Sequence, residues 1–195
     1  MIFSEEMLQS LRDLTASPKL QVSTSAAWGS DRPGHRLLIR QYLQHQLQDS
    51  ISTHELGELL NLDNVPSYKD VYVSISHTSG MGLIAVAPTA VGVDVESLAR
   101  VKSKSLARVS SHEEMAQAPS PAHLWAAKEA AFKALYSFAQ PSVISLITIG
   151  NWQKINSQTE TFNLMNLMDF KAPARGLGVT FEFSSIVMSF FVFNA

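Results

Sequence analysis

The sequence predicts an α+β fold with antiparallel sheets, and three observations lead to this class. Helical spacing of apolar residues is followed by strand-like runs before residue 90, and the same order returns after it. Short β-branched runs in the middle of the chain follow one another through linkers short enough for hairpins. The final part, 143–195, alternates and is rich in Val, Ile, Phe and Thr, which favours antiparallel strands.

The elements before residue 90 follow from this spacing and from the turn residues between them. Ser4 is the expected N-cap of the first helix, and Pro18 ends its pattern. A short strand is expected over 20–23. The predicted helices cover 4–15, 31–48 and 54–61, and the first two predicted strands of the central group cover 71–76 and 82–87.

A third central strand is expected over 91–96, and the linkers 78–80 and 88–90 predict that the three strands form consecutive hairpins. A mostly helical block follows over 101–138. Within it, Ser120 as N-cap and Pro121 in the first turn predict the start of a long helix. Pro141 ends the block, and three or four strands are expected in 143–195.

The composition is that of a globular protein with a substantial core. Hydrophobic residues make up 46% and charged residues 16% of the 195 residues, and the net charge of -2 argues against general nucleic-acid binding. The absence of cysteine excludes disulfides and thiolate chemistry and is compatible with a cytoplasmic location. We expect no signal peptide and no transmembrane segment, because no basic segment precedes an apolar core and no apolar run reaches about 20 residues.

Two short segments carry the most chemical information. In the strand 91–96, Asp94 and Glu96 are two residues apart and therefore leave the same face, opposite to Val93 and Val95. In the helix after Pro121, Glu129 and Lys133 are four residues apart on one face. Three carboxylates that converge beside a lysine suit a divalent cation that holds a phosphate.

The two segments resemble the motifs of the 4'-phosphopantetheinyl transferases. Val91-Gly92-Val93-Asp94-Val95-Glu96 is similar to their acidic motif, the stretch from Trp125 to Lys133 is similar to their W-x-x-K-E motif, and Ile75-Ser76-His77-Thr78 lies upstream as expected. Because Asp94 lies mid-chain, the resemblance is to the long, surfactin-type members, which are pseudodimers. It implies two similar α+β halves, 1–88 and 89–195, each with an antiparallel sheet and a long helix, in a monomer with its active site between the halves.

This resemblance implies an enzyme that moves the 4'-phosphopantetheine arm of coenzyme A to a serine of an apo acyl or peptidyl carrier protein and releases 3',5'-ADP. It implies Mg²⁺, with Mn²⁺ as a substitute, held by Asp94, Glu96 and Glu129. Glu96 binds directly or through water, and either Glu129 or a bound water accepts the serine proton. Lys133 stabilises the phosphates. The structural alternatives are a solvated polar face for the carboxylates and a helical Glu–Lys pair worth about 0.2–0.5 kcal/mol.

Further coenzyme A contacts are implied by position, together with their plain structural alternatives. Ser76 and His77 match the pair that contacts phosphate, although a histidine at a strand end is often only a turn residue. Lys128 matches the other lysine of the helical motif. Arg32 and Arg36 lie where the long members bind the 3'-phosphate, or else are solvated charges. Trp125 and Phe132 are expected to pack the helix against the sheet rather than to contact a ligand.

A basic run follows the acidic strand without an intervening acid, and it contains Arg100, Lys102, Lys104 and Arg108. Carrier proteins present an acidic helix beside their serine, so this run is a candidate docking surface, with a solvated helix face as the alternative. Two rival functions stay open: a non-catalytic module that binds coenzyme A or carrier protein, and a magnesium-dependent phosphohydrolase.

Overall fold

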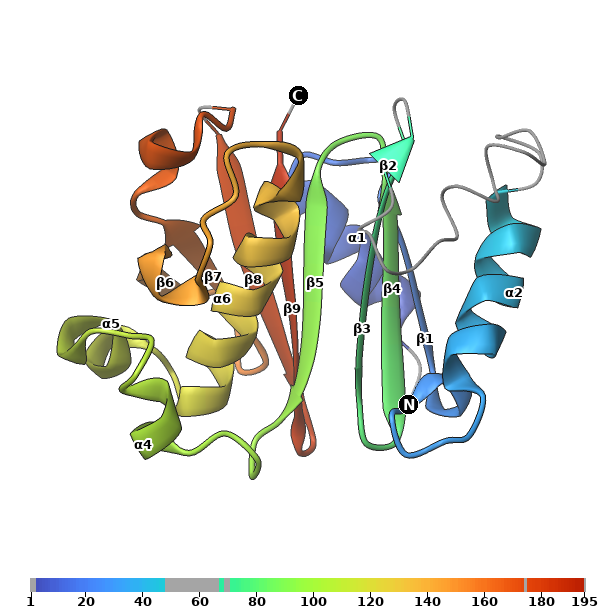
Figure 1. Ribbon diagram of the computed structural model, residues 1–195, viewed down its shortest axis with the longest axis horizontal. Coiled ribbons are helices and arrows are strands. Elements are labelled where there is room, and N and C mark those ends of the chain that lie inside the picture. Colours follow the sequence, from blue (N-terminus) through green and yellow to red (C-terminus); the bar gives the residue numbers. More distant parts are fainter. Residues whose placement is uncertain (1–2, 48–66, 69–70, 174, 195) are drawn as a thin grey trace.

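The computed structural model describes residues 3–47, 67–68, 71–173 and 175–194, and these form a mixed α+β fold with two antiparallel sheets (Figure 1). The expected helix over 54–61 lies outside the described residues. The helices are α1 (Glu5–Leu14), α2 (His35–Leu47), α4 (Ser103–Leu106), α5 (His112–Gln117) and α6 (Pro121–Ala134), with 3-10 turns η1 (Ala26–Trp28), η2 (Leu135–Ser137), η3 (Ile144–Leu146) and η4 (Leu167–Phe170).

The strands before residue 90 form one sheet, sheet A, and the strands after it form the other, sheet B. Sheet A has the order β1-β4-β3-β2, and sheet B has the order β5-β9-β8-β7-β6. Their bounds are β1 (Gln21–Ser25), β2 (Ser67–Tyr68), β3 (Val71–Thr78), β4 (Met81–Ala87), β5 (Val91–Ser97), β6 (Ile149–Lys154), β7 (Thr159–Leu164), β8 (Gly176–Phe183) and β9 (Ile186–Phe193). The four strands after residue 143 confirm the sequence prediction for this part of the chain.

Both sheets have the same connectivity. In each, a first strand leads into helices, and the chain returns through a hairpin whose last strand pairs with the first: β1 with β4, and β5 with β9. The division of the chain into halves 1–88 and 89–195 stays a prediction, and the common connectivity is the feature that supports it.

One predicted hairpin is wrong. The linker 78–80 does join β3 and β4 as an antiparallel pair, but the linker 88–90 does not form a second hairpin. Strand β5 pairs instead with β9, from Val91 with Val192 to Ser97 with Ile186. The reason is that β4 already has β1 on one edge and β3 on the other, so it has no free edge for β5.

Helix α1 covers a core that both sheets share. Ser4 caps the helix by accepting a hydrogen bond from the Met7 N–H at 3.1 Å, which confirms the expected cap. Leu11 of this helix is fully buried against apolar side chains of β4, β5, β8 and β9, among them Leu83, Val93 and Phe190. In Figure 1, α1 lies behind the strands, α6 lies in front of sheet B, and α2 lies beside sheet A at the right of the view.

The two sheets meet where β3 runs beside β5. No backbone ladder joins these strands, because they belong to different sheets. Serine hydroxyls replace it: Ser74 Oγ accepts from the Val93 N–H at 2.9 Å, and Ser76 Oγ accepts from the Val95 N–H at 3.3 Å. Two buried backbone donors on the outer edge of β5 are thereby satisfied.

Helix α6 packs closely on β5 and β9. It begins after Ser120, whose hydroxyl accepts from the His123 N–H at 3.4 Å, with Pro121 at its start as expected. Trp125 and Phe132 are partly buried in the core between this helix and sheet B, which confirms their predicted packing role.

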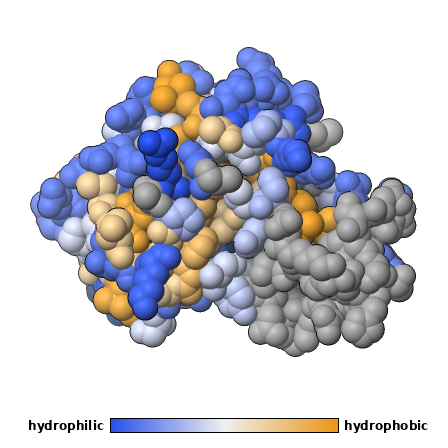
Figure 2. All heavy atoms as spheres, turned by 90° about the horizontal axis from the view of Figure 1, so that it is seen from above, coloured by the Kyte–Doolittle hydropathy of each residue, from blue (hydrophilic) through white to orange (hydrophobic). Residues whose placement is uncertain are grey.

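The surface carries exposed hydrophobic side chains at several separate places, with Met168 of η4 the most exposed at 82%. Figure 2 shows hydrophobic patches on one face that hydrophilic residues separate from each other. Among the helices of the described residues, none combines the length and the apolar character that crossing a membrane would need.

Candidate functional site

Strand β5 carries the acidic pair at the junction of the two sheets. Val93 and Val95 are buried in the core under α1, so Asp94 and Glu96 leave the opposite face, as the alternation predicted. Both carboxylates are largely buried, at 5% and 8% exposure. A buried pair of acids is uncommon in a purely structural role, because a carboxylate loses hydration on burial.

Asp94 is held through only one of its two oxygens. Its Oδ1 accepts a hydrogen bond from Ser76 Oγ at 2.7 Å and pairs with Lys133 Nζ at 2.8 Å. Its Oδ2 is buried and has no hydrogen-bond partner among the residues that the structure describes. The carboxylate is therefore fixed in orientation and keeps one oxygen for another ligand.

Lys133 reaches this position because α6 approaches β5 very closely. Its ammonium also donates to the Val93 carbonyl at 3.0 Å, so it is bound to the strand at two points. The approach depends on Gly92, where a Cβ would lie 1.9 Å from the Ala130 carbonyl oxygen and 2.5 Å from the Ala134 nitrogen. Glycine is needed here for space and not for an unusual backbone conformation.

The remaining carboxylates of the site are shifted toward their neutral forms. Burial raises the pKa of Glu129, and the charge of Asp94 raises it further, while Lys133 acts in the opposite direction. Burial likewise raises the pKa of Glu96, with a further contribution from Asp94. Its Oε2 has no hydrogen-bond partner in the described ranges, although the Arg100 guanidinium lies 3.7 Å away. Because the charge of Asp94 raises the pKa of both glutamates, Asp94, Glu96 and Glu129 form one electrostatic cluster.

These observations bear on whether the site suits a divalent cation. Two buried carboxylate oxygens without partners, together with acids that repel each other, provide the oxygen donors that Mg²⁺ prefers. As their side chains stand, no three His, Asp or Glu residues among those described form a group that could hold a metal ion. The donor set therefore fits an ion bound by one or two carboxylates that completes its shell with water and phosphate.

His77 follows Ser76 on β3 and points to the opposite side, toward the first turn of α2. Its ring lies edge-to-face with that of His35, with centroids 4.7 Å apart. Burial lowers the pKa of His77, and the nearby charges of His35, Arg36 and Lys133 lower it further. His77 of β3 and the α2 residues His35 and Arg36 thus gather around the end of β3, near Lys133.

The loop before α2 is fixed to the β3–β4 turn. Asp31 Oδ1 accepts from the Gly80 N–H at 2.6 Å, and the Ser30 N–H donates to the Thr78 carbonyl at 2.9 Å. These bonds bring the predicted residue Arg36 toward His77. Arg32 is exposed, lies 3.8 Å from the Asp31 carboxylate, and lines a shallow cavity with Ala26, Ala27, Pro33 and Leu38.

Lys128 does not join this site, contrary to the sequence prediction. Its side chain is fully buried, and its ammonium pairs with Glu114 Oε1 at 2.8 Å and donates to the Ile147 carbonyl. Burial would raise the pKa of Glu114, but hydrogen bonds from Lys128, Ile149 and Ser111 together lower it below its usual value. Lys128 therefore joins α6 to α5 and β6, and its fully buried ammonium lies away from the acidic cluster.

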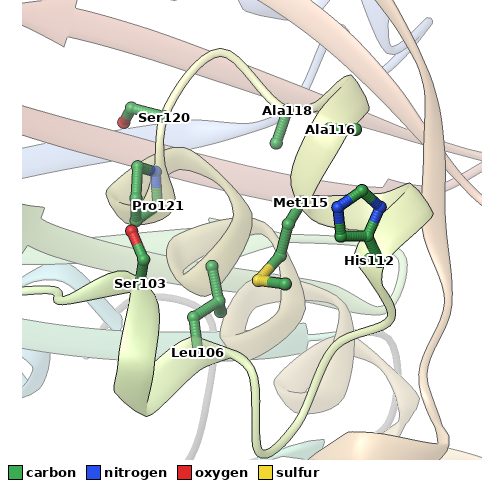
Figure 3. Close-up of a pocket in the computed structure, with 8 residues that line it drawn as sticks. All are labelled: Ser103, Leu106, His112, Met115, Ala116, Ala118, Ser120 and Pro121. Carbon is green, nitrogen blue, oxygen red and sulfur yellow. The ribbon is translucent and has the colours of Figure 1, made fainter.

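The basic run extends from the end of β5 into α4. Its four members, Arg100, Lys102, Lys104 and Arg108, are all exposed. Beside them, a cavity of about 240 Å³ lies between α4, α5 and the start of α6, and Figure 3 shows its lining. Leu106, Met115 and Pro121 contribute apolar surface to this cavity, so positive charge and apolar surface lie next to each other.

Residues 90–186 match the sequence model of the 4'-phosphopantetheinyl transferase superfamily. The chain belongs to this superfamily and is therefore a transferase by class, as the motifs indicated. The matched segment contains Asp94, Glu96, Glu129 and Lys133, and it begins just before β5. No curated protein matches the chain in sequence.

Sequence reasoning missed two roles in the site. Ser76 was expected to contact phosphate, but its single hydroxyl hydrogen is donated to Asp94. Gly92 was treated only as part of a motif, whereas the close approach of α6 depends on it. A glycine inside an otherwise β-branched strand is itself a signal for such an approach.

Proposed function

We propose that this protein transfers the 4'-phosphopantetheine group of coenzyme A to a serine of an apo acyl or peptidyl carrier protein, with Mg²⁺, and releases 3',5'-ADP. The observation that carries the proposal is the convergence of Asp94 and Lys133 within a segment that matches the superfamily. We also propose a cytoplasmic monomer composed of two α+β halves.

In the proposed reaction, the serine oxygen forms a bond to the phosphorus that carries the pantetheine arm. The bond from this phosphorus to the oxygen of 3',5'-ADP breaks, and 3',5'-ADP leaves with the electron pair. A bound Mg²⁺ would neutralise charge on the phosphate oxygens. Asp94 and Glu129 would hold it, with Glu96 as a third ligand directly or through water; Asp94 Oδ2 and Glu96 Oε2 are the buried oxygens that lack partners among the described residues.

Lys133 is proposed to stabilise charge on the phosphate, and Glu129 is proposed to accept the serine proton. Lys133 is 23% exposed and carries a flexible chain, so it can turn from Asp94 toward the phosphate that develops charge. Glu129 accepts the serine proton, directly or through a water. Its position on the same face of α6 as Lys133, in one electrostatic cluster with Asp94, supports this role.

The basic residues around β3 support binding of the rest of coenzyme A. The charge of Arg36 and the imidazole groups of His35 and His77 as hydrogen-bond donors suit a diphosphate. Arg32 and Arg36 at the start of α2 are proposed for the 3'-phosphate. The exposed basic run and the neighbouring cavity are proposed to receive the acidic carrier.

The test is an intact-mass assay with coenzyme A, Mg²⁺ and several apo carriers. We expect a mass gain of one phosphopantetheine group on the carrier, and loss of at least about 100-fold in rate for Asp94→Ala and Glu129→Gln. Glu113→Gln, at an exposed glutamate of α5, is the matched control and should retain the parental rate.

The rival functions give different outcomes in the same assay. Binding of coenzyme A without a mass gain on any carrier would indicate a non-catalytic module. Release of 3',5'-ADP at the same rate with and without carrier would indicate a phosphohydrolase. Either result would contradict the proposed transfer.

A further inference from the structure

The hydroxyl of Ser76 occupies an unusual position at the junction of the two sheets. It accepts from the Val95 N–H at 3.3 Å and donates to Asp94 Oδ1 at 2.7 Å. Ser76 is 8% exposed, so both bonds are largely shielded from water. A hydroxyl has a single hydrogen, and here that hydrogen is directed to a carboxylate of β5 and not into the coenzyme A region.

Ser74 provides a natural comparison two residues earlier on the same strand. Its hydroxyl accepts from the Val93 N–H at 2.9 Å, which is the same type of contact between β3 and β5. Among the hydrogen bonds of the described residues, none joins its hydroxyl to a carboxylate. The two serines therefore share the task of joining the sheets, and only Ser76 has the additional contact with Asp94.

We propose that Ser76 is a positioning residue that holds Asp94 Oδ1, so that Oδ2 is presented to the divalent cation. This inference rests on the proposed function, because it takes Asp94 as a metal ligand. Within the described part of the chain, Asp94 Oδ1 has two donors, Ser76 and Lys133, and Oδ2 has none. When Lys133 turns to the phosphate, Ser76 remains as the donor that fixes the carboxylate.

The position of Ser76 explains why a neutral donor serves here. A second cation on Oδ1 would repel an incoming metal ion, whereas a hydroxyl fixes the carboxylate without adding charge. Because the hydroxyl is itself fixed by the Val95 N–H, its orientation is set by the same strand that carries Asp94. Hydrogen bonds to metal ligands of this kind usually change metal affinity by about 10–100-fold.

The test measures Mn²⁺ binding to the free protein by electron paramagnetic resonance, without coenzyme A or carrier. We expect Ser76→Ala to weaken Mn²⁺ binding by about 10–100-fold. Ser74→Ala should change it less than about threefold, because it removes the contact between the strands alone. Both variants should lower the melting temperature to a similar extent, and Ser76→Thr, which keeps the hydroxyl, should restore the affinity.

Equal Mn²⁺ affinity in Ser76→Ala and Ser74→Ala would overturn the inference and leave Ser76 with a structural role only. If Ser76→Ala does not fold, Ser76→Cys replaces it, because a thiol of similar size is a weaker donor. Parental affinity in folded Ser76→Cys would likewise overturn the inference. If the parent binds no Mn²⁺, or if Asp94→Ala binds it as the parent does, the proposed metal site fails and this inference fails with it.

Discussion

The close contact between α6 and β5 makes Gly92→Ala a sensitive test of how the site is assembled. A Cβ at this position would lie 1.9 Å from the Ala130 carbonyl oxygen, which is a backbone atom inside a helix. An ordinary carbon–oxygen contact is about 3.3 Å, so the helix or the strand has to move by about 1.4 Å. Neither side has a flexible side chain that could absorb this movement.

The expected cost follows from this displacement. Overpacking of a well-packed core typically costs about 1–3 kcal/mol, and a rigid backbone contact belongs at the upper end or beyond it. A loss of about 3 kcal/mol corresponds to a decrease of roughly 6–12 °C in melting temperature for a chain of this size. The same movement would lengthen the 2.8 Å contact between Lys133 and Asp94 beyond hydrogen-bonding distance.

Gly150→Ala is the matched control, because it makes the same change in another strand of sheet B. There, a Cβ would lie 3.1 Å from Met165 Cγ and 3.3 Å from Gln117 Oε1, both of which belong to flexible side chains. We expect this variant to lose less than about 1 kcal/mol.

The assay is urea unfolding together with the rate of phosphopantetheine transfer. Gly92→Ala should lower both the free energy of unfolding and the transfer rate, whereas Gly150→Ala should preserve the rate. If Gly92→Ala is as stable and as active as Gly150→Ala, the close approach of α6 to β5 is not what positions Lys133, and this reasoning is refuted.

Two further predictions concern the charges away from the acidic cluster. Glu114→Gln should cost about 3–5 kcal/mol at pH 7, because it leaves the ammonium of Lys128 buried without its counter-ion. Since the pKa of Glu114 is lowered in the folded protein, the pair stabilises above the unfolded pKa of 4.5 and loses this effect as the pH falls through the folded value. The difference in unfolding free energy between parent and variant should therefore narrow as the pH falls below 4.5, and a constant difference would contradict the pairing. Lys104→Glu with Arg108→Glu should raise the KM for apo carrier by roughly tenfold at low salt, with the difference fading at high salt, whereas Lys19→Glu, an exposed control, should not. An unchanged KM at low salt would remove the docking role of this run.

The sequence predicted the parts of the site that depend on local periodicity. Alternation along 91–96 places Asp94 and Glu96 on one face, and β5 has this arrangement. Helical spacing places Glu129 and Lys133 on one face of α6, and Lys133 reaches Asp94. Both patterns follow from backbone geometry alone, so neighbouring residues are enough to predict them.

Lys128 shows where periodicity stops being informative. It is adjacent to Glu129, but successive residues of a helix are about 100° apart, so the two side chains lie on different faces. Which of these faces meets the core depends on where α5 and β6 pack, and the partner Glu114 lies on a separate helix. A motif lysine therefore became a buried structural residue for a reason that only the tertiary arrangement reveals.

The pairing of β5 has a similar origin. A three-residue linker permits a hairpin between β4 and β5, but pairing also needs a free strand edge, and β1 and β3 occupy both edges of β4. The competing strand that occupies an edge can come from anywhere in the chain. Here β1 is separated from β4 in the sequence by helix α2 and other elements, yet it occupies the edge of β4 that β5 would need. Strand β5 therefore pairs with β9 in sheet B.

The junction between the sheets gives the adjacent residues Ser76 and His77 separate functions. Because side chains alternate along a strand, Ser76 points to β5 and holds Asp94, while His77 points to α2 and contacts His35. In the interior of a single sheet, two adjacent residues of a strand would point their side chains into the layers that cover its two faces. Beyond its short pairing with β2 at Val71 and Tyr72, β3 runs beside β5 and lies between the acidic residues of β5 and α6 and the basic residues of α2. We therefore propose different roles for the two residues: Ser76 serves the proposed metal site, and His77 serves the proposed phosphate site. Because they are adjacent on β3, they keep these two sites at a fixed distance from each other.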